Sequence, residues 1–147
     1  MILDGRTSFA QNASLNTGAP GAYVIGDVID TGRANGVGPG LPLFIVIVVK
    51  ASATSGGAAT LALRLVSSTT GTINPATATA HGESPTFALA ALVAGREVWT
   101  FAFPPCTSNR WWSLVQVTGG AAFTGGAITA VVTTDPTAWR AYAAART

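Results

Sequence analysis

The chain has 147 residues and a net charge of +2, with 48% of its residues hydrophobic and only 10% charged. Soluble domains usually carry about 25% charged residues, so we expect either that other protein covers much of the surface or that the chain is a monomer with a surface of Ala, Thr, Ser and Gly. The Arg residues are scattered and Lys50 is the sole Lys, so the sequence supplies no basic run of the kind that nucleic-acid binding normally needs. The single cysteine, Cys106, excludes an intrachain disulfide or a cysteine zinc cluster.

Clusters of Gly, Pro, Ser, Thr and Asn divide the chain into short runs that are rich in β-branched and aromatic residues. This pattern predicts an all-β fold, an antiparallel β-sandwich or barrel of about eight strands in a single domain over residues 1–147. One helical turn is expected at 88–94, and the tail 137–147 is the main candidate for a helix. The expected strands, in chain order, are 23–29, 43–50, 60–67, 76–81, 86–89, 97–103, 110–118 and 127–134.

Two of these strands have informative patterns. Residues 43–50 are nearly all apolar and β-branched, so we expect both faces of this strand to be covered, one by the core and one by another layer or subunit. In 60–67 the alternation places Leu61, Leu63 and Leu65 on one face, which predicts a half-buried strand. The longest apolar run, 41–49, is too short for a membrane helix, which needs about 20 residues.

The remaining segments are expected to be loops or arms. Loops are predicted at 33–40, 52–59, 68–75 and 119–126, where Gly, Ser and Ala gather. The first residues lack the basic and apolar regions of a signal peptide. We expect Ile2, Leu3 and Phe9 of the segment 1–15 to dock into the sandwich or onto a neighbouring subunit, with Arg6 pairing a carboxylate there. The alternative is that this segment forms the first strand of the same sheet.

The adjacent residues Trp111 and Trp112 must point to opposite faces of their strand. At most one of them can therefore enter the core. The other is covered by a loop that begins at Ser52 or Gly119, or it is an anchor for a protein partner or a sugar.

Sugar-stacking tryptophans usually have polar neighbours such as Asp, Asn or Gln, and here only Asn109 and Gln116 qualify. The sequence therefore favours a protein interface over a sugar platform.

Residues able to support catalysis are few. His81 is the only histidine, and its position beside Gly82 predicts a solvated loop residue. Asp30 and Asp135 precede turns, where carboxylates commonly bond the turn backbone. Cys106 could act as a nucleophile with His81, but the sequence shows no third member of such a catalytic set. We therefore expect the Cys106 thiol to be a buried packing residue. We therefore expect no catalytic, cofactor or metal site, and a cupin-type enzyme is disfavoured because it needs a cluster of His and carboxylate ligands.

Several short motifs occur in order along the chain. They are the start Met1 to Asp4, the strand end Val28 to Gly32, the Gly-Pro-rich residues 37–42, the strand Phe44 to Val49, the run Phe103 to Pro105, the pair Arg110 and Trp111, and the strand 127–133. Together they resemble the small capsid cement, or decoration, proteins of tailed bacteriophages, including the Bordetella short-tailed phage type. The tail after Asp135 has no counterpart in this resemblance.

The resemblance implies a jelly roll, made in the host cytoplasm, that sits on the outer capsid surface of the virion. It would clamp neighbouring subunits of the major capsid protein as a homo-oligomer, with a dimer favoured and a trimer open, and would bind no nucleic acid, membrane or cofactor. The alternative is a carbohydrate- or receptor-binding jelly-roll module. The expected protein-interface residues are Ile2, Leu3, Arg6, Phe9, Arg110, Trp111, Trp112, Trp139 and Tyr142.

Overall fold

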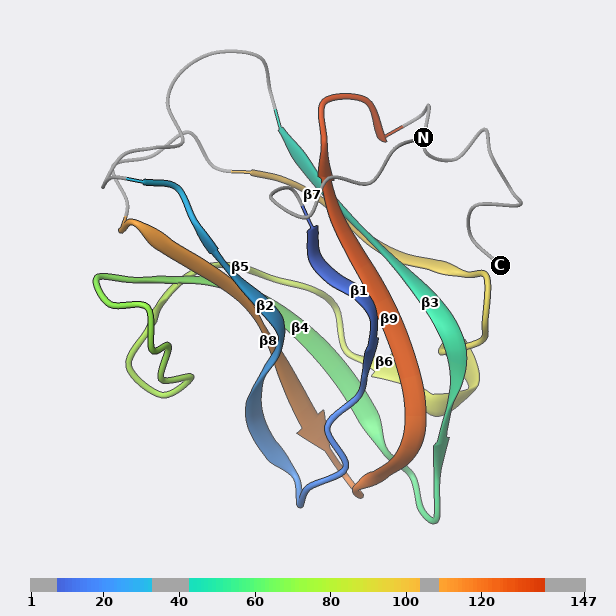
Figure 1. Ribbon diagram of the computed structural model, residues 1–147. Helices are drawn as coiled ribbons and strands as arrows, with labels where there is room; N and C mark the ends of the chain where they lie inside the picture. The colour runs from blue at the N-terminus through green and yellow to red at the C-terminus, as the bar shows by residue number, and fades with distance from the viewer. Residues whose placement is uncertain (1–7, 33–42, 104–108, 137–147) are drawn as a thin grey trace.

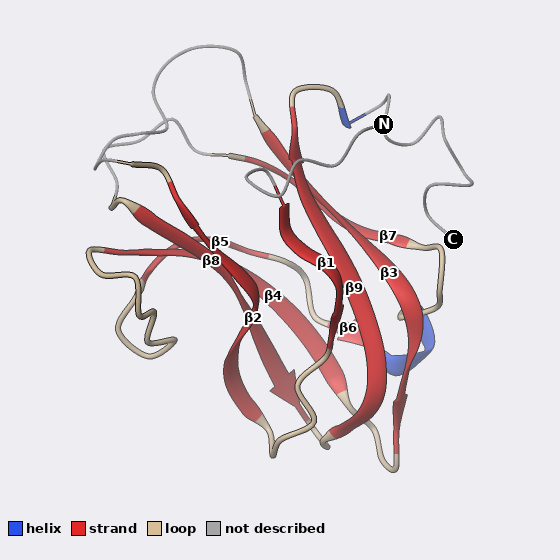
Figure 2. Cartoon of the chain, in the orientation of Figure 1, coloured by secondary structure: helices blue, strands red, loops and turns tan. Residues whose placement is uncertain are grey.

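Two antiparallel sheets, packed face to face, make up the computed structural model of the chain (Figures 1 and 2). The structure describes residues 8–32, 43–103 and 109–136. The elements of these residues are β1 Ser8–Ser14, β2 Gly21–Asp30, β3 Phe44–Ser55, β4 Thr60–Ser68, β5 Thr79–Glu83, β6 Phe87–Ala88, the 3-10 turn η1 Leu89–Ala91, β7 Glu97–Ala102, β8 Trp111–Gly119 and β9 Phe123–Thr133.

The strand order is that of a jelly roll. One sheet, called sheet A below, has the order β1-β9-β3-β7, and the other, sheet B, has the order β2-β8-β4-β5, with the short β6 pairing β4. Neighbouring strands such as β1 and β9, or β2 and β8, come from opposite ends of the chain. This nesting of early and late strands across two sheets is the double Greek key of jelly rolls, so the expected fold class is confirmed.

The core lies between the two sheets and follows the period-two alternation of the strands. Leu61, Leu63 and Leu65 of β4 are all fully buried, as the sequence predicts, and they face Ile45 and Ile47 of β3 in the same cluster. Each fully buried side chain of this size stabilises the fold by about 1.5–3 kcal/mol relative to its exposed state.

From Ile45 to Val49, strand β3 is buried on both faces, as expected from its continuous apolar run. Ile45, Ile47 and Val49 belong to the main core, whereas Val46 and Val48 form a separate buried cluster with Val131 of β9 on the opposite face of sheet A. Val46 and Val48 are 0% and 1% exposed. The outer face of sheet A at this point is thus dry rather than solvated.

The first described residues form a strand of the sandwich. β1 pairs β9 along its length, and Phe9 is fully buried, with its ring stacked 6.4 Å from that of Phe103. The alternative expectation, a first strand of the same sheet, is therefore confirmed for Ser8–Ser14. The other expected residues of this segment, Ile2, Leu3 and Arg6, lie outside the described residues.

The predicted loops 52–59 and 119–126 are wrong in part, because β3 continues to Ser55 and β9 begins at Phe123. Thr124 donates a hydrogen bond to Thr54 at 2.9 Å across the two strands. Gly126 has a φ of +126°, and a Cβ there would lie 2.9 Å from the backbone of Ala53. Small residues are needed because these two strands approach closely, and the same small residues resemble a loop in the sequence.

The remaining expectations fall close to the observed elements. β5 begins at Thr79 instead of residue 76, because the carbonyl of Asn74 accepts bonds from Thr77 N and Ala78 N in a turn. The helical turn expected at 88–94 is the 3-10 turn Leu89–Ala91. The described residues contain no helix long and apolar enough to cross a membrane, and the tail 137–147 lies outside them.

If β1 is part of the core, Phe9→Ala should lower the free energy of unfolding by about 3–5 kcal/mol, because it leaves a cavity between the sheets. The neighbouring Gln11 is exposed, so Gln11→Ala should change stability by less than about 0.5 kcal/mol. Urea denaturation followed by fluorescence measures both. Equal, small effects of the two substitutions would contradict the placement of Phe9.

Candidate functional site

Strand β8 directs its two tryptophans to opposite sides of sheet B. Trp112 is fully buried in the core, where its ring lies 4.5 Å from the rings of both Phe103 and His81. Trp111 is half-buried on the outer face of the sheet. The alternation expected from the sequence is confirmed, and the structure identifies Trp112 as the core residue.

Two of the expected interface residues are corrected by this arrangement. Phe9 and Trp112 are both 0% exposed, so the structure assigns them to the core and leaves neither side chain to a partner. Arg110 and Trp111 are on the surface, while Ile2, Leu3, Arg6, Trp139 and Tyr142 lie outside the described residues. Nothing in the sequence around Phe9 or Trp112 shows whether the ring packs in the core or against a partner.

Asp30, Arg110 and Trp111 form one surface cluster where β2 meets the start of β8. Arg110 donates from Nε to Asp30 Oδ1 at 2.5 Å and from Nη2 to Oδ2 at 2.7 Å. The Arg110 guanidinium carbon also lies 4.9 Å from the centre of the Trp111 ring, in a cation–π contact. Asp30 and Trp111 are cross-strand partners in the β2–β8 register.

The two hydrogen bonds between Arg110 and Asp30 shift the pKa values of both side chains. The hydrogen bond from Arg110, aided by the backbone N–H of Gly32, lowers the pKa of Asp30 to about 2. The same contact raises the pKa of Arg110. Asp30 therefore does bond its turn backbone, as expected, and it also holds Arg110. Since the Asp30 and Arg110 side chains are 33% and 45% exposed, solvent screens the pair and its net stabilisation is small.

The loop 69–78 covers Trp111, in place of the loops expected to begin at Ser52 or Gly119. A Cβ at Gly71 would lie 3.5 Å from the Trp111 ring, which is ordinary van der Waals contact. The same loop is anchored by Ile73, which is buried against Val66 and Val115 on the outer face of sheet B. With Arg110 and this loop both against the ring, Trp111 is poorly placed to serve as a sugar-stacking platform.

His81 is not the solvated loop residue that the sequence predicts. It lies on β5, packs on Trp112, and its Nε2 is 2.7 Å from Ser67 Oγ, a side chain that is fully buried. Asn109 donates its Nδ2 to the same Ser67 oxygen at 3.2 Å. This arrangement fits a neutral imidazole that accepts the Ser67 proton at Nε2, and burial lowers the pKa of His81. The Ser67–His81 pairing had no signal in the sequence, because 14 residues separate the two.

Several ionisable side chains of the described residues take part in ion pairs or ring contacts. Within residues 8–32, 43–103 and 109–136, no group of three or more His, Cys, Asp or Glu side chains is placed to hold a metal ion. Two of the carboxylates, Asp30 and Glu83, are paired with Arg110 and Arg64. Cys106 lies outside the described residues.

The described surface has little large apolar area. Val93, at 50% exposed, is the only large hydrophobic side chain exposed among the residues that the structure describes. An interface formed by these residues must therefore be polar, or combine small side chains with the few surface aromatics, which is common for non-obligate interfaces.

A comparison with known protein families places the chain. The model of the Bbp16 family matches residues 17–132, which run from before β2 almost to the end of β9. The chain belongs to the Bbp16 family. The name of the family points to a Bordetella phage protein, so Bbp16 membership agrees with the phage resemblance of the sequence. No curated protein matches the chain.

The partly buried His81 should make the stability of the fold depend on pH. Its folded pKa lies below the ordinary 6.5, so between these two values the unfolded chain binds a proton that the folded chain does not. The free energy of unfolding should therefore fall as the pH drops below about 6.5. Denaturant titrations between pH 7.5 and 5 measure this slope.

His81→Asn provides the matched control, because His81 is the only histidine of the chain. The variant should be less stable overall, since it loses the contact with Trp112, but its stability should be nearly constant over the same pH range. A wild-type protein whose stability is equally constant would contradict the lowered pKa that partial burial gives His81.

Proposed function

We propose that the chain is a structural virion protein that binds the outer surface of a phage head and cements neighbouring major capsid subunits. The observation that carries this proposal is the Bbp16 match across nearly the whole jelly roll. The chain would be made in the host cytoplasm, act without a cofactor or catalytic step, and bind neither nucleic acid nor membrane.

The physical character of the described fold supports a cementing role. A protein that binds the assembled shell, but not its separated subunits, stabilises the shell by mass action. This role needs a rigid body with many moderate contacts and no reaction centre. The sandwich provides the rigid body through its continuous core, and the low content of charged residues leaves few groups that must be desolvated when it docks.

The cluster of Asp30, Arg110 and Trp111 is the best described candidate for the contact with the shell. Tryptophan and arginine are enriched among the residues that dominate binding energy. Asp30 already holds the Arg110 guanidinium in one orientation, so little side-chain entropy remains to be lost on binding. The terminal residues Ile2, Leu3, Arg6, Trp139 and Tyr142 remain part of the proposed interface.

A homo-oligomer is also part of the proposal, with a dimer at two-fold positions of the shell favoured and a trimer at three-fold positions as the alternative. The support is the low charge of the chain, since the outer face of β3 is already buried within the chain and adds nothing to it. Symmetry would then repeat the Asp30–Arg110–Trp111 cluster in each copy.

Binding to heads that lack the protein tests the function. Purified protein should co-sediment with such heads and raise the temperature at which they release their contents. Arg110→Ala should weaken binding by about tenfold or more, the effect of losing about 1.4 kcal/mol. Arg64→Ala breaks a second surface ion pair of the described residues, with Glu83, at the far edge of sheet B, and should leave binding within about threefold of wild type.

The results for the wild-type protein test the cementing function, and the results for Arg110→Ala test where the contact with the shell lies. If wild-type protein, shown to be folded by circular dichroism, does not bind or protect heads, the cementing function is wrong. If it binds and Arg110→Ala binds equally well, the function stands and the contact lies elsewhere on the molecule.

A further inference from the structure

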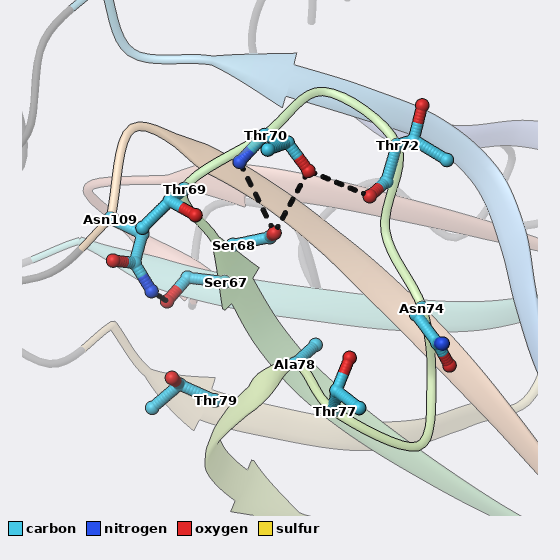
Figure 3. Close-up of a pocket in the computed structure, with 10 residues that line it drawn as sticks. All are labelled: Ser67, Ser68, Thr69, Thr70, Thr72, Asn74, Thr77, Ala78, Thr79 and Asn109. Atoms are coloured by element: carbon cyan, nitrogen blue, oxygen red, sulfur yellow. Dashed lines mark hydrogen bonds between the residues drawn. The ribbon is translucent and has the colours of Figure 1, made fainter.

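A cavity of about 450 Å³ lies beside β4, between the end of this strand, the loop 69–78 and Asn109 (Figure 3). Ten described residues line it, and nine of them carry a neutral hydroxyl or amide side chain; the tenth is Ala78. The volume is within the range of small-ligand sites, about 300–1,000 Å³. The cavity belongs to neither the Asp30–Arg110–Trp111 cluster nor the buried contact of Trp112.

The lining selects a chemical class of ligand. No charged side chain is among the described lining residues, so a phosphate or other anion would find no counter-charge, and a divalent cation would find no carboxylate. An apolar ligand would leave many hydroxyl groups without water or a partner. A ligand with several neutral hydroxyl groups fits, because each hydroxyl both donates and accepts a hydrogen bond, as Ser and Thr do.

The loop that forms the cavity is held in shape before any ligand arrives. Thr70 donates from its hydroxyl to the carbonyl of Thr72 at 3.0 Å, and its N–H is bonded to Ser68 Oγ at 3.3 Å. Asn74 Oδ1 accepts the N–H of Ala76 at 2.9 Å. Ile73, buried under the loop, fixes it to sheet B. Such preorganisation reduces the entropy cost of binding.

Several lining groups keep hydrogen-bonding capacity for a ligand. The hydroxyls of Thr77 and Thr79 have no hydrogen bond to the described part of the protein, and Asn109 uses only its Nδ2, on Ser67. Figure 3 shows Thr77 and Thr79 on one side of the cavity and Asn109 beside Ser67. Thr77 comes from the loop, Thr79 from β5 and Asn109 from the residues just before β8, so they can contact one small ligand from different directions.

We propose that this cavity binds a sugar residue of a neutral glycan, through hydrogen bonds from Thr77, Thr79 and Asn109. The proposal is independent of the cementing function, since it uses other residues. Because Trp111 is occupied by the loop and by Arg110, no aromatic platform adds stacking energy, and the affinity for a single sugar should be in the millimolar range.

Titration of isotopically labelled full-length protein, followed by amide chemical shifts, tests the proposal. The probes are glucose, galactose, mannose, N-acetylglucosamine and their disaccharides, with inorganic phosphate and Ca²⁺ as charged probes. At least one sugar should cause saturable shifts confined to residues 67–79 and Asn109. The charged probes should cause none there.

Thr77→Val and Thr79→Val remove one hydroxyl each with little change in shape, and each should weaken the sugar by about threefold to tenfold. Thr86→Val is the matched control, because Thr86 is exposed and does not line the cavity, and it should bind like wild type. The proposal is overturned if no sugar gives saturable shifts, if the two cavity variants bind like wild type, or if only phosphate, Ca²⁺ or shell-protein peptides shift these residues.

Discussion

Two adjacent tryptophans at the start of β8 point to opposite faces of sheet B, and the residues packed around them depend on this arrangement. Neighbouring side chains of a strand point to opposite faces. Here the inner residue, Trp112, is buried in the core, and the outer residue, Trp111, is half-buried on the outer face of the sheet. Trp112 packs on His81 and thereby places the Ser67–His81 pair. Trp111 carries Arg110 on its ring and the loop at Gly71 against it. One local rule of strand geometry thus positions both the proposed contact surface and the wall of the neutral cavity.

The second constraint is the low charge of the chain, which has different consequences inside and outside the sandwich. Inside, apolar side chains of β3 are buried on both of its faces, in two separate clusters. Outside, it leaves a described surface of small neutral side chains with Val93 as its exposed large hydrophobic residue. Such a surface can dock on a protein lattice at low desolvation cost, and its clustered hydroxyls can face a neutral ligand. Asp30 and Arg110, two of the few charged residues, form an ion pair that holds the Arg110 side chain in place.

Strands with a clear hydrophobic periodicity are predicted correctly from the sequence. The prediction is wrong where contacts between distant parts of the chain determine whether a residue is paired or buried. Leu61, Leu63 and Leu65 alternate, so their burial follows from local geometry. The extension of β3 to Ser55 is hidden, because small residues that allow close strand pairing are also typical of loops. His81 resembles a turn residue until β5 pairs β4 and brings it onto Trp112. Burial of Phe9 likewise depends on pairing with β9, more than a hundred residues away.

Quantitative mass spectrometry of purified intact virions tests the central claim most directly. The cementing account predicts that this chain is present at a fixed ratio to the major capsid protein, with a copy number of the same order as that of the shell subunits. It also predicts that protease added to intact virions reaches the chain before it reaches the shell protein. A virion preparation that lacks the chain, or holds it in only a few copies shielded from protease, would contradict the account.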